Sequence, residues 1–285
     1  MEKNLSAHSD GFTSIFDSSN VRSERYFDLT DKSYHGGTTL SSGMLPKWDI
    51  LNGNYLVKRC GLDSYGNFLT DAFNEETVYL FSQLAGIECA YYRSIEIKYF
   101  DNERMEIMQC PAVISEIFPG ELIHYRILRQ QFKFGSVHDE LIEFTDRFNV
   151  QPKLNDLFFA DYIFNQQDRH SKNIGIVENN MSPIFDSGAC LFFDVMDDLL
   201  TDDLINKIPR QKTFGKKLDE LLQFSLKYIN PEFSFTFNEN KLKRDVDSVL
   251  EQMTQKRLYS EKRIAFIRKL MKARISGIGQ ILAEI

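Results

Sequence analysis

Residues 161–175 read DYIFNQQDRHSKNIG and carry two aspartates, an arginine, a histidine and two asparagines between apolar runs. The stretch that leads into them, at 153–166, has the apolar spacing of a helix. The stretch that follows, NIGIV at 173–177, is typical of a short buried strand. A polar loop in this place is either a site with chemistry to perform or an ordinary surface turn, and the rest of the chain decides between them.

Residues 174–186 predict a β-hairpin. Its turn has the composition ENNMS, and its second strand, PIFDSG, ends in Asp-Ser-Gly. Asp168 and Asn173 precede the first strand, so antiparallel pairing would bring both to the same end as Asp186. The amide oxygen of Asn173 and the carboxylate of Asp186 are hard ligands that suit Mg²⁺, which leaves Asp168 to orient a hydroxyl nucleophile.

The composition is that of a globular protein. The chain has 285 residues, of which 42% are hydrophobic and 13% aromatic, enough for the core of one large domain or of two lobes. Its net charge of −7 argues against a general nucleic-acid binder, because neutralising phosphates needs a basic surface.

The cysteines and the hydropathy pattern bear on location. The four cysteines lie far apart without paired spacing, so we expect neither a zinc site nor a disulfide framework. The N-terminus lacks the apolar core of a signal peptide, and no run approaches the roughly 18 apolar residues of a membrane span. We therefore expect a cytoplasmic protein, with secretion as an effector as the open alternative.

The first half of the chain predicts a small sheet with one helix. Residues 1–35 are rich in Ser, Asp and Asn and are expected to form a tail, laid over the fold or partly disordered. A Gly- and Ser-rich loop at 36–43 then precedes Asn52-Gly53, the favoured pair of a tight hairpin turn. The second strand of this hairpin carries Lys58 near its end.

The next segments complete that sheet and begin a helical half. NEETVYLFSQLAGI at 74–87 predicts a helix, and residues 94–118 predict two more strands. From Pro119 onward helical spacing dominates, so the predicted fold class is α+β, with an antiparallel-sheet N-lobe over 36–118 and a mainly helical C-lobe over 119–285. The predicted helices of the second part lie at 121–132, 138–149, 153–166, 216–228, 240–255 and 259–283.

The order of the polar elements matches the needs of phosphoryl transfer. That reaction uses a glycine-containing loop over the phosphates, a lysine on an N-terminal strand, an orienting aspartate and a metal pair of Asn and Asp. A lone strand lysine is usually a solvated edge residue, and a lone Asp-Arg pair is often a salt bridge. Together they favour phosphoryl transfer, because the chain offers all of them in the same order: 36–43, Lys58, Asp168, Asn173 and Asp186.

These segments resemble a known family. DRHSKN followed by FDSG resembles the catalytic and metal-binding segments of the HipA-like serine/threonine kinases, and more distantly of the phosphatidylinositol kinases. SSGMLPKWDI and GNYLVK resemble that family's phosphate loop and nucleotide-binding strand, and NEETVYLFSQLAGI resembles its N-lobe helix. The resemblance covers about residues 36–195 and implies a protein-kinase-like bilobal fold that binds ATP and Mg²⁺.

The resemblance also implies roles for individual residues. Lys58 would contact the nucleotide phosphates and pair with Glu75, for which Glu76 is the near rival. Asp168 would be the catalytic aspartate, and Asn173 and Asp186 the Mg²⁺ ligands. We expect the remaining nucleotide contacts from the phosphate loop and from the hinge between the lobes, at Ser41, Ser42, Gly43, Glu116, Ile117 and Phe118.

Two departures limit the comparison. The longer HipA proteins carry an additional N-terminal subdomain, and we expect the residues before position 36 to be too few to form one. Contacts that this subdomain makes with an antitoxin are therefore not carried over, although an antitoxin or another regulatory partner stays open. The loop also has two adjacent serines, Ser41 and Ser42, instead of a glycine at every expected turn.

The function expected from the sequence is an ATP- and Mg²⁺-dependent protein serine/threonine kinase. Its substrate would be a protein with a Ser or Thr acceptor, and it would also phosphorylate itself in TTLSSG, at Ser41 or Ser42 before Thr38 or Thr39. The alternatives are a small-molecule or lipid kinase and a nucleotide-binding pseudokinase. His170 is expected to pack and hydrogen-bond the backbone, whereas Arg169 would pair with a carboxylate or with a phosphorylated residue.

Overall fold

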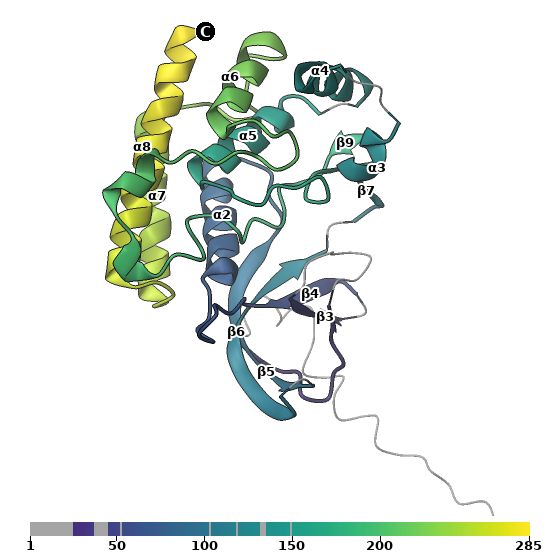
Figure 1. Ribbon diagram of the computed structural model, residues 1–285, viewed down its shortest axis with the longest axis vertical. Helices are drawn as coiled ribbons and strands as arrows, with labels where there is room; N and C mark the ends of the chain where they lie inside the picture. The colour runs from purple at the N-terminus through teal and green to yellow at the C-terminus, as the bar shows by residue number, and fades with distance from the viewer. Residues whose placement is uncertain are drawn as a thin grey trace, which may run out of the picture.

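The protein has two lobes, a sheet and a larger group of helices (Figure 1). The computed structural model describes residues 25–36, 45–51, 53–102, 104–117, 119–131, 135–148 and 150–285. The α+β fold class predicted from the sequence is confirmed. Most of the expected phosphate loop, with Ser41, Ser42 and Gly43, lies outside the described residues, as does Phe118.

The sheet of the N-lobe has six strands in the order β1-β5-β6-β4-β3-β2. Neighbouring strands pair antiparallel, except that β1 and β5 run parallel. Alternating apolar residues explain the two long strands, because one face of each strand packs on the lobe's core. The bounds are β1 Tyr26–Asp28, β2 His35–Gly36, β3 Pro46–Ile50, β4 Tyr55–Arg59, β5 Tyr92–Asp101 and β6 Glu106–Glu116.

The first strand corrects one prediction. The sequence placed residues 26–35 in an N-terminal tail, but β1 joins the sheet and buries Phe27 and Leu29. The backbone N–H of Leu29 donates to the carbonyl of Lys98, 2.6 Å away. Two apolar residues in a polar stretch give no periodicity, so the partner strand, rather than the local sequence, makes this segment a strand.

The hairpin of β3 and β4 turns where the sequence predicted. The N–H of Asn54 donates to the carbonyl of Leu51 at 3.2 Å, and Gly53 has a φ of +83°. A positive φ suits glycine, which has no Cβ to clash with the backbone. Asn52, the other central residue of the turn, lies outside the described residues.

Helix α2 (Asp71–Ala85) connects the two lobes. It ends at Gly86, whose left-handed conformation lets its N–H donate to the carbonyl of Ser82. Ala72 packs below the sheet, whereas Val78 and Phe81 belong to the core of the C-lobe. In Figure 1, α2 lies between the sheet and the helices near the C-terminus. This helix thus packs on both lobes.

The C-lobe is mainly helical, as predicted, but its first segment differs. Residues 122–124 form a strand instead of the start of a helix, because they pair with residues 175–177. The helices are α3 Tyr125–Arg129, α4 Val137–Arg147, α5 Lys153–Ile163, α6 Leu218–Tyr228, α7 Glu239–Gln255 and α8 Glu261–Glu284, and the short strands are β7 Leu122–His124, β8 Gly175–Val177 and β9 Asn180–Met181. Among the described residues, no helix combines the length and apolarity that crossing a bilayer requires.

The predicted hairpin over 174–186 is shorter than expected. Its second strand is β9 alone, because Pro183 comes two residues after Met181 and has no N–H to continue the ladder. Ile184 instead forms a parallel bridge with Cys89, just after α2. Asp186 therefore reaches the site from a segment that runs back toward the N-lobe.

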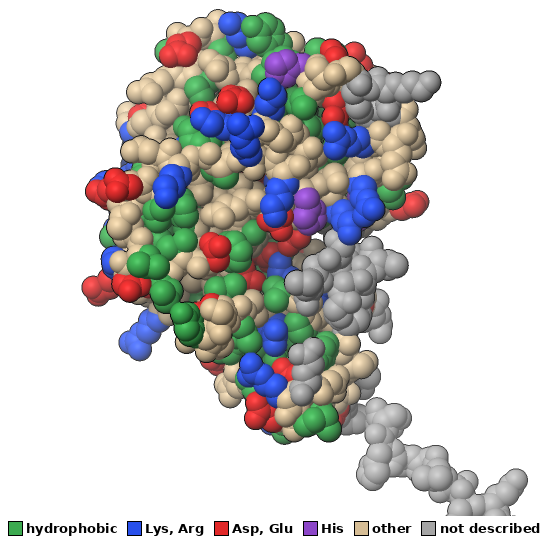
Figure 2. All heavy atoms as spheres, in the orientation of Figure 1, with side chains coloured by type: hydrophobic (Ala, Val, Ile, Leu, Met, Phe, Trp, Pro, Cys, Tyr) green, Lys and Arg blue, Asp and Glu red, His purple; other side chains and the backbone are tan. Residues whose placement is uncertain are grey.

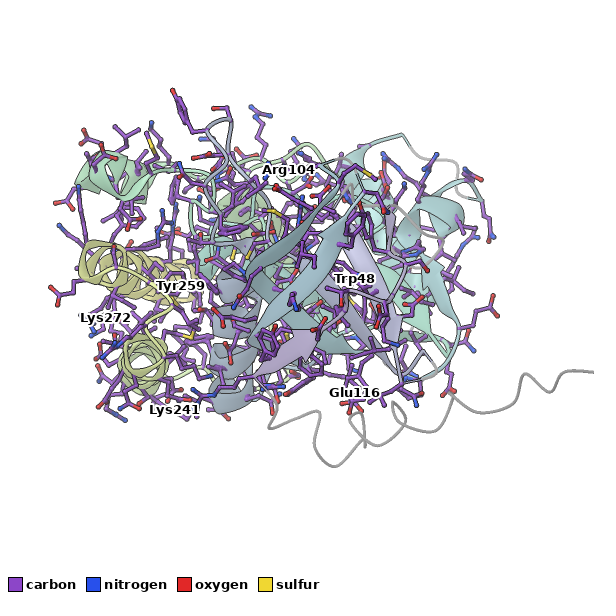
Figure 3. All side chains as sticks on the ribbon, turned by 90° about the horizontal axis from the view of Figure 1, so that it is seen from below. Trp48, Arg104, Glu116, Lys241, Tyr259 and Lys272 are labelled. Carbon is purple, nitrogen blue, oxygen red and sulfur yellow. The ribbon has the colours of Figure 1, made fainter. Side chains whose placement is uncertain are left out.

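Each lobe has its own aromatic packing. Trp48 is buried in the N-lobe, with its ring centroid 5.2 Å from that of Tyr99 and 5.5 Å from that of Tyr34. On the helical side, Tyr259 contacts Phe73 of α2 edge to face. Figure 3 shows Trp48 among the strands and Tyr259 beside the helices. The two lobes thus have separate hydrophobic cores, and α2 joins the lobes.

Candidate active site

Lys58 lies at the centre of a cluster of charges between the lobes. Its side chain leaves β4, and its Nζ forms an ion pair with Oε1 of Glu75 from α2. The same Nζ lies 3.0 Å from Oδ1 of Asp186. The Glu75 side chain is only 1% exposed. The structure thus brings together three of the residues that the sequence selected from positions far apart in the chain.

Glu76, the rival candidate, faces another way. Its carboxylate pairs with Lys256 from the end of α7 and accepts from the backbone N–H of Ser94, 3.1 Å away. Consecutive residues of a helix point about 100° apart, so only one of two neighbouring glutamates can reach Lys58. The contact belongs to Glu75.

Burial and mutual attraction shift the pKa values in this cluster. Burial alone would lower the pKa of Lys58, but Asp186 and Glu75 together raise it well above its usual 10.5. Burial raises the pKa of Glu75 to about 7, although Lys58 opposes the shift. Burial would also raise the pKa of Asp186, yet Lys58 and Lys47 hold it well below its usual 3.8. Lys58 therefore stays charged beside an ionised Asp186.

A second lysine, Lys47 on β3, stands directly opposite Lys58 in the sheet. It is only 2% exposed, and burial together with the charge of Lys58 lowers its pKa to about 8. The sequence analysis missed this residue, although a turn centred on Asn52-Gly53 already pairs position 47 with position 58. Two lysines thus lie on neighbouring strands beside the carboxylates of Glu75 and Asp186.

Arg169 fixes the polar loop within residues 161–175. Its guanidinium, 1% exposed, donates to Asp161 at 3.0 Å and to the hydroxyl of Ser187 at 3.1 Å. It also donates to two backbone carbonyls, those of Asn173 at 3.2 Å and of Phe185. One buried arginine therefore links the loop to the segment that carries Asp186. This link explains how the loop and that segment meet although the hairpin is not continuous. The partner of Arg169 is the carboxylate of Asp161, which is one of the two alternatives expected from the sequence.

Asp168 lies in the same loop, with its side chain partly exposed. Its Oδ1 lies 2.7 Å from Nζ of Lys212, and its backbone N–H donates to the side chain of Gln166 at 3.0 Å. The side chains of Asp168 and Lys212 are 40% and 60% exposed, so this pair is open to solvent. His170 bonds the backbone, as expected: its Nδ1 accepts from the N–H of Lys172 at 3.3 Å.

The two proposed metal ligands have suitable chemistry. Asn173 is 6% exposed, and its Nδ2 donates to the carbonyl of Asp168 at 3.4 Å, so its Oδ1 is the amide atom available to a cation. Asp186 has a φ of +53°, and its N–H donates to the hydroxyl of Tyr92 at 2.8 Å. Such a backbone strain in a non-glycine residue often marks a functional site. One carboxylate and one amide oxygen fit Mg²⁺, which keeps most of its ligands for water and phosphate.

No larger acidic metal cluster accompanies this pair. Within the described part of the chain, no group of three or more His, Cys, Asp or Glu side chains converges to hold an ion. Structural zinc and calcium sites usually need such groups. The donor set therefore fits a magnesium ion shared with phosphates better than a metal bound by protein ligands alone.

Asn74 of α2 anchors the Asp-Ser-Gly segment. Its side-chain amide donates to the carbonyl of Cys190 at 2.6 Å and of Gly188 at 3.2 Å, and its Oδ1 accepts from Tyr259 at 2.8 Å. Gly188 must be small, since a Cβ there would lie 3.1 Å from the carbonyl oxygen of Asp71 and 3.2 Å from Oε1 of Glu75. This close approach of the Asp-Ser-Gly segment to α2 lets Glu75 and Asp186 contact the same lysine, Lys58.

The hinge is only partly described. Glu116 pairs with Tyr55 at the end of β6, and the N–H of Ile117 donates to the carbonyl of Asn54 at 2.9 Å. Figure 3 shows Glu116 at one edge of the sheet. Both residues thus continue from β6 into the connection between the lobes, which is the position predicted for a nucleotide hinge.

Comparison with known proteins identifies the fold. No family model matches the sequence, and no curated protein is significantly similar to it. Among solved structures, a proinflammatory kinase of Helicobacter pylori, CtkA, is 19% identical with a TM-score of 0.57, over 90% of this chain and 98% of that chain. This likeness extends over both lobes.

Two further structures match with lower scores. HipA in a complex of HipA, HipB and operator DNA from Shewanella oneidensis is 14% identical with a TM-score of 0.46, over 85% of this chain and 66% of that one. A Golgi casein kinase is 11% identical with a TM-score of 0.42, over 90% and 72%. The likeness to the H. pylori kinase shows the fold, and it confirms the predicted protein-kinase-like bilobal architecture.

Proposed function

We propose that this protein is an ATP- and Mg²⁺-dependent kinase that phosphorylates serine or threonine on a protein. The observation that carries the proposal is the contact of Lys58 with both Glu75 and Asp186. A lysine held by an α-helix glutamate beside a metal-binding aspartate is the arrangement that positions nucleotide phosphates in protein kinases. The rest of the site supplies the acceptor side.

The phosphate side of the reaction would depend on positive charge held in place. Lys58 stays charged because Asp186 and Glu75 raise its pKa, so its Nζ is available to the phosphate oxygens. Lys47 adds a second buried cation on the adjacent strand. Asn173 and Asp186 would hold Mg²⁺, which neutralises phosphate charge when it is bound. Fixed charges of this kind stabilise the transition state without reorganising.

The acceptor side would depend on Asp168. Its carboxylate is 40% exposed, so an incoming hydroxyl can reach it. As the hydroxyl oxygen attacks the γ-phosphorus, Asp168 would accept its proton, and the leaving group would be ADP. Arg169 keeps this loop in place from the buried side and would make no contact with the reacting atoms.

Self-phosphorylation within residues 38–42 is part of the proposal. These residues, Ser41 and Ser42 among them, lie outside the described part of the chain. The sequence gives the reason, since hydroxyls in a loop beside the γ-phosphate would be the nearest acceptors. Two added negative charges there would repel the nucleotide phosphates and lower the affinity for ATP.

The test is incubation of the purified chain with Mg²⁺ and ATP labelled at the γ-phosphate, in the presence of protein and lipid fractions. We expect label on serine or threonine of protein and none with Asp168→Asn. Label on lipid or on a small molecule instead would identify the other class of kinase. Nucleotide binding without any transfer would identify a pseudokinase, and either result would overturn the proposal.

A further inference from the structure

A strongly basic loop lies next to Asp168. Residues 207–217, called here the basic loop, read KIPRQKTFGKK and contain five Lys or Arg and no acid, in a chain whose net charge is −7. Stretches of like charge repel one another and commonly form interaction surfaces. The position of this loop decides what it could interact with. Its cations are Lys207, Arg210, Lys212, Lys216 and Lys217.

The basic loop is firmly attached to the catalytic loop. The backbone N–H and the hydroxyl of Thr213 both donate to the carbonyl of Arg169, at 3.2 and 2.8 Å. The side chain of Gln211 donates to Asp161 at 3.2 Å, and Phe214 packs against Tyr125. These three anchors are buried, so the loop is a fixed wall beside the acceptor side of the site.

Before, between and after these anchors, cations of the loop reach the solvent. Arg210, Lys212 and Lys217 are exposed. Of the five, only Lys212 forms an ion pair with a carboxylate among the described residues, and that carboxylate is Asp168. Arg210 and Lys217 are backbone bridge partners on opposite sides of the loop, and the guanidinium of Arg210 donates to the carbonyl of Gly215 at 3.1 Å. An anion bound beside them would bring negative charge to two exposed cations that have no carboxylate partner among the described residues.

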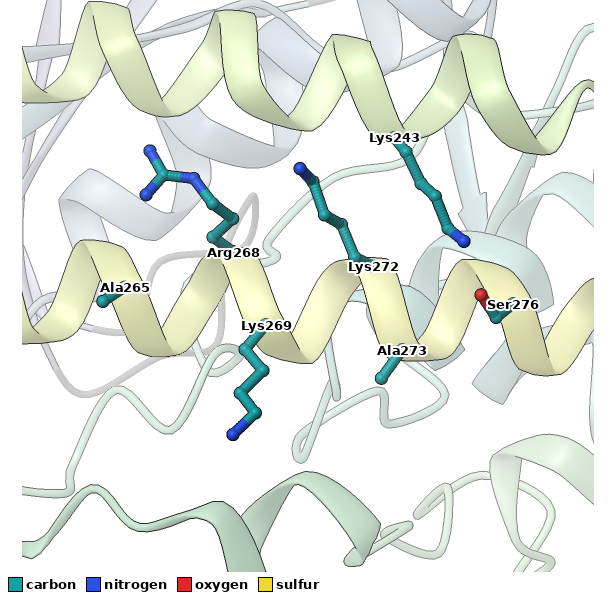
Figure 4. A pocket seen from close by; sticks show the side chains of 7 residues that line it. All are labelled: Lys243, Ala265, Arg268, Lys269, Lys272, Ala273 and Ser276. Atoms are coloured by element: carbon teal, nitrogen blue, oxygen red, sulfur yellow. The ribbon is translucent and has the colours of Figure 1, made fainter.

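A second basic surface differs from the basic loop because its cations are paired with carboxylates. A groove of about 570 Å³ between α7 and α8 is lined by Lys243, Arg268, Lys269 and Lys272 (Figure 4). Each of these cations already has a carboxylate partner in the chain: Glu239, Asp247, Asp202 and again Asp247. Its charge is neutralised internally, so it gives no reason to expect an anionic ligand.

We propose that the basic loop is the docking surface for the acceptor segment of the substrate, and that it selects segments with acidic residues next to the Ser or Thr. The inference rests on the proposed kinase function. Figure 2 shows Lys and Arg side chains spread over the helical half of this face, some of them close to the boundary between the lobes. An acidic peptide there would replace Asp168 as the partner of Lys212, and would thereby free the carboxylate for the acceptor hydroxyl.

Peptide binding without ATP tests the docking surface separately from the chemistry. Three fluorescein-labelled peptides carry one serine flanked by glutamates, by glutamines or by lysines, and fluorescence anisotropy at low ionic strength reports their affinity. We expect the glutamate peptide to bind at least about tenfold more tightly than the lysine peptide, because several surface charge contacts combine. The same preference should appear in kcat/KM with Mg·ATP.

Charge reversal supplies the matched variant and control. The double variant Arg210→Glu, Lys217→Glu should reverse the preference, so that the lysine peptide binds better. The control is the double variant Lys227→Glu, Arg244→Glu, which has the same change in net charge. Its two residues are exposed on α6 and α7 and have no carboxylate partner among the described residues. This control should keep the original preference. Arg210→Gln, Lys217→Gln, which should abolish the preference, replaces the first variant if that one does not fold.

The results of these experiments test the docking surface and the kinase function separately. Equal binding of the three peptides, or an unchanged preference in the reversed variant, would overturn the docking surface even if the protein is an active kinase. Stronger binding to vesicles of anionic lipid than to the glutamate peptide would overturn it as well. Charge-dependent peptide binding without any phosphorylation would support the surface and overturn the kinase function.

Discussion

The site contains two lysine–carboxylate pairs in opposite environments. Lys58 and Glu75 meet between the lobes, where their side chains are 13% and 1% exposed. Lys212 and Asp168 meet at the surface, where both side chains are largely open to water. A buried charge that loses its partner is costly, whereas an exposed pair is screened and easily exchanged. The fold thus fixes the lysine that is proposed to face the nucleotide and leaves the proposed acceptor side adjustable.

The anchors of the two pairs explain this difference. Glu75 stands on α2, which the C-lobe core and the bonds of Asn74 hold in place. Lys212 stands on a loop whose backbone is fixed but whose side chain projects into solvent. Substrate binding can therefore separate Lys212 from Asp168 at little cost, while separating Lys58 from Glu75 would disturb the contact between the lobes.

The largest expected effect comes from breaking the buried pair. Lys58→Ala and Glu75→Ala should each lower kcat/KM by about a hundredfold or more, because each removes or misplaces a fixed charge at the phosphates. The double variant should cost little more than either single change, since the two residues act as a unit. Independent, additive losses would contradict the coupling. Glu76→Ala should leave turnover much less affected, because Glu76 contacts Lys256 instead.

Loss of the Asn74 anchor should have the next largest effect. Asn74→Ala leaves the carbonyls of Gly188 and Cys190 without their donor, which should lower the free energy of unfolding by about 2–3 kcal/mol. Urea denaturation measures this change. The matched control is Asn240→Ala on an exposed position of α7, where we expect a change within about 0.5 kcal/mol. Equal effects of the two substitutions would show that Asn74 is no anchor.

The pH dependence of activity should reveal the buried pair. Burial raises the pKa of Glu75 from 4.5 to about 7, so activity should fall as the pH drops through 7 and Glu75 loses the charge that holds Lys58. Because the folded state binds this proton more tightly than the unfolded state, the contribution of Glu75 to the free energy of unfolding should rise as the pH falls from about 7 toward 4.5. Glu75→Gln should remove both dependences, and an unchanged pH profile in that variant would assign them to another group.

The smallest effect should come from the exposed pair. Lys212→Ala should change the free energy of unfolding by less than about 1 kcal/mol, because solvent and salt screen its attraction to Asp168. Thermal unfolding at low and high ionic strength checks this. A loss as large as that of Asn74→Ala would mean that the exposed pair supports the fold, and the comparison between the two pairs would fail.

The sequence predicted the site where local patterns and motif order sufficed. The helical spacing of 74–87 and the Asn-Gly turn before Lys58 needed no long-range information, and the structure confirms both elements. The turn even fixes the register that places Lys47 opposite Lys58, a consequence that the sequence analysis did not draw.

Other features depend on distant partners and could not be predicted. The strand at Tyr26–Asp28 exists because β5 offers an edge. The segments that carry Asn173 and Asp186 are held together by Arg169, which donates from a buried position to the carbonyls of Asn173 and Phe185, and not by the continuous hairpin that the sequence suggested. Nothing in a single sequence distinguishes such an arginine from one in a surface salt bridge.

Titration calorimetry of Mg·ATP binding to Asp168→Asn and Asp186→Asn tests the central division of roles most directly. In the proposed mechanism Asp168 would face the acceptor, so Asp168→Asn should bind Mg·ATP with nearly the affinity of the unmodified protein while turnover falls at least about a hundredfold. Asp186 contacts Lys58 and would bind the metal, so Asp186→Asn should lose most of that affinity. Loss of nucleotide binding in Asp168→Asn together with normal binding in Asp186→Asn would contradict the account.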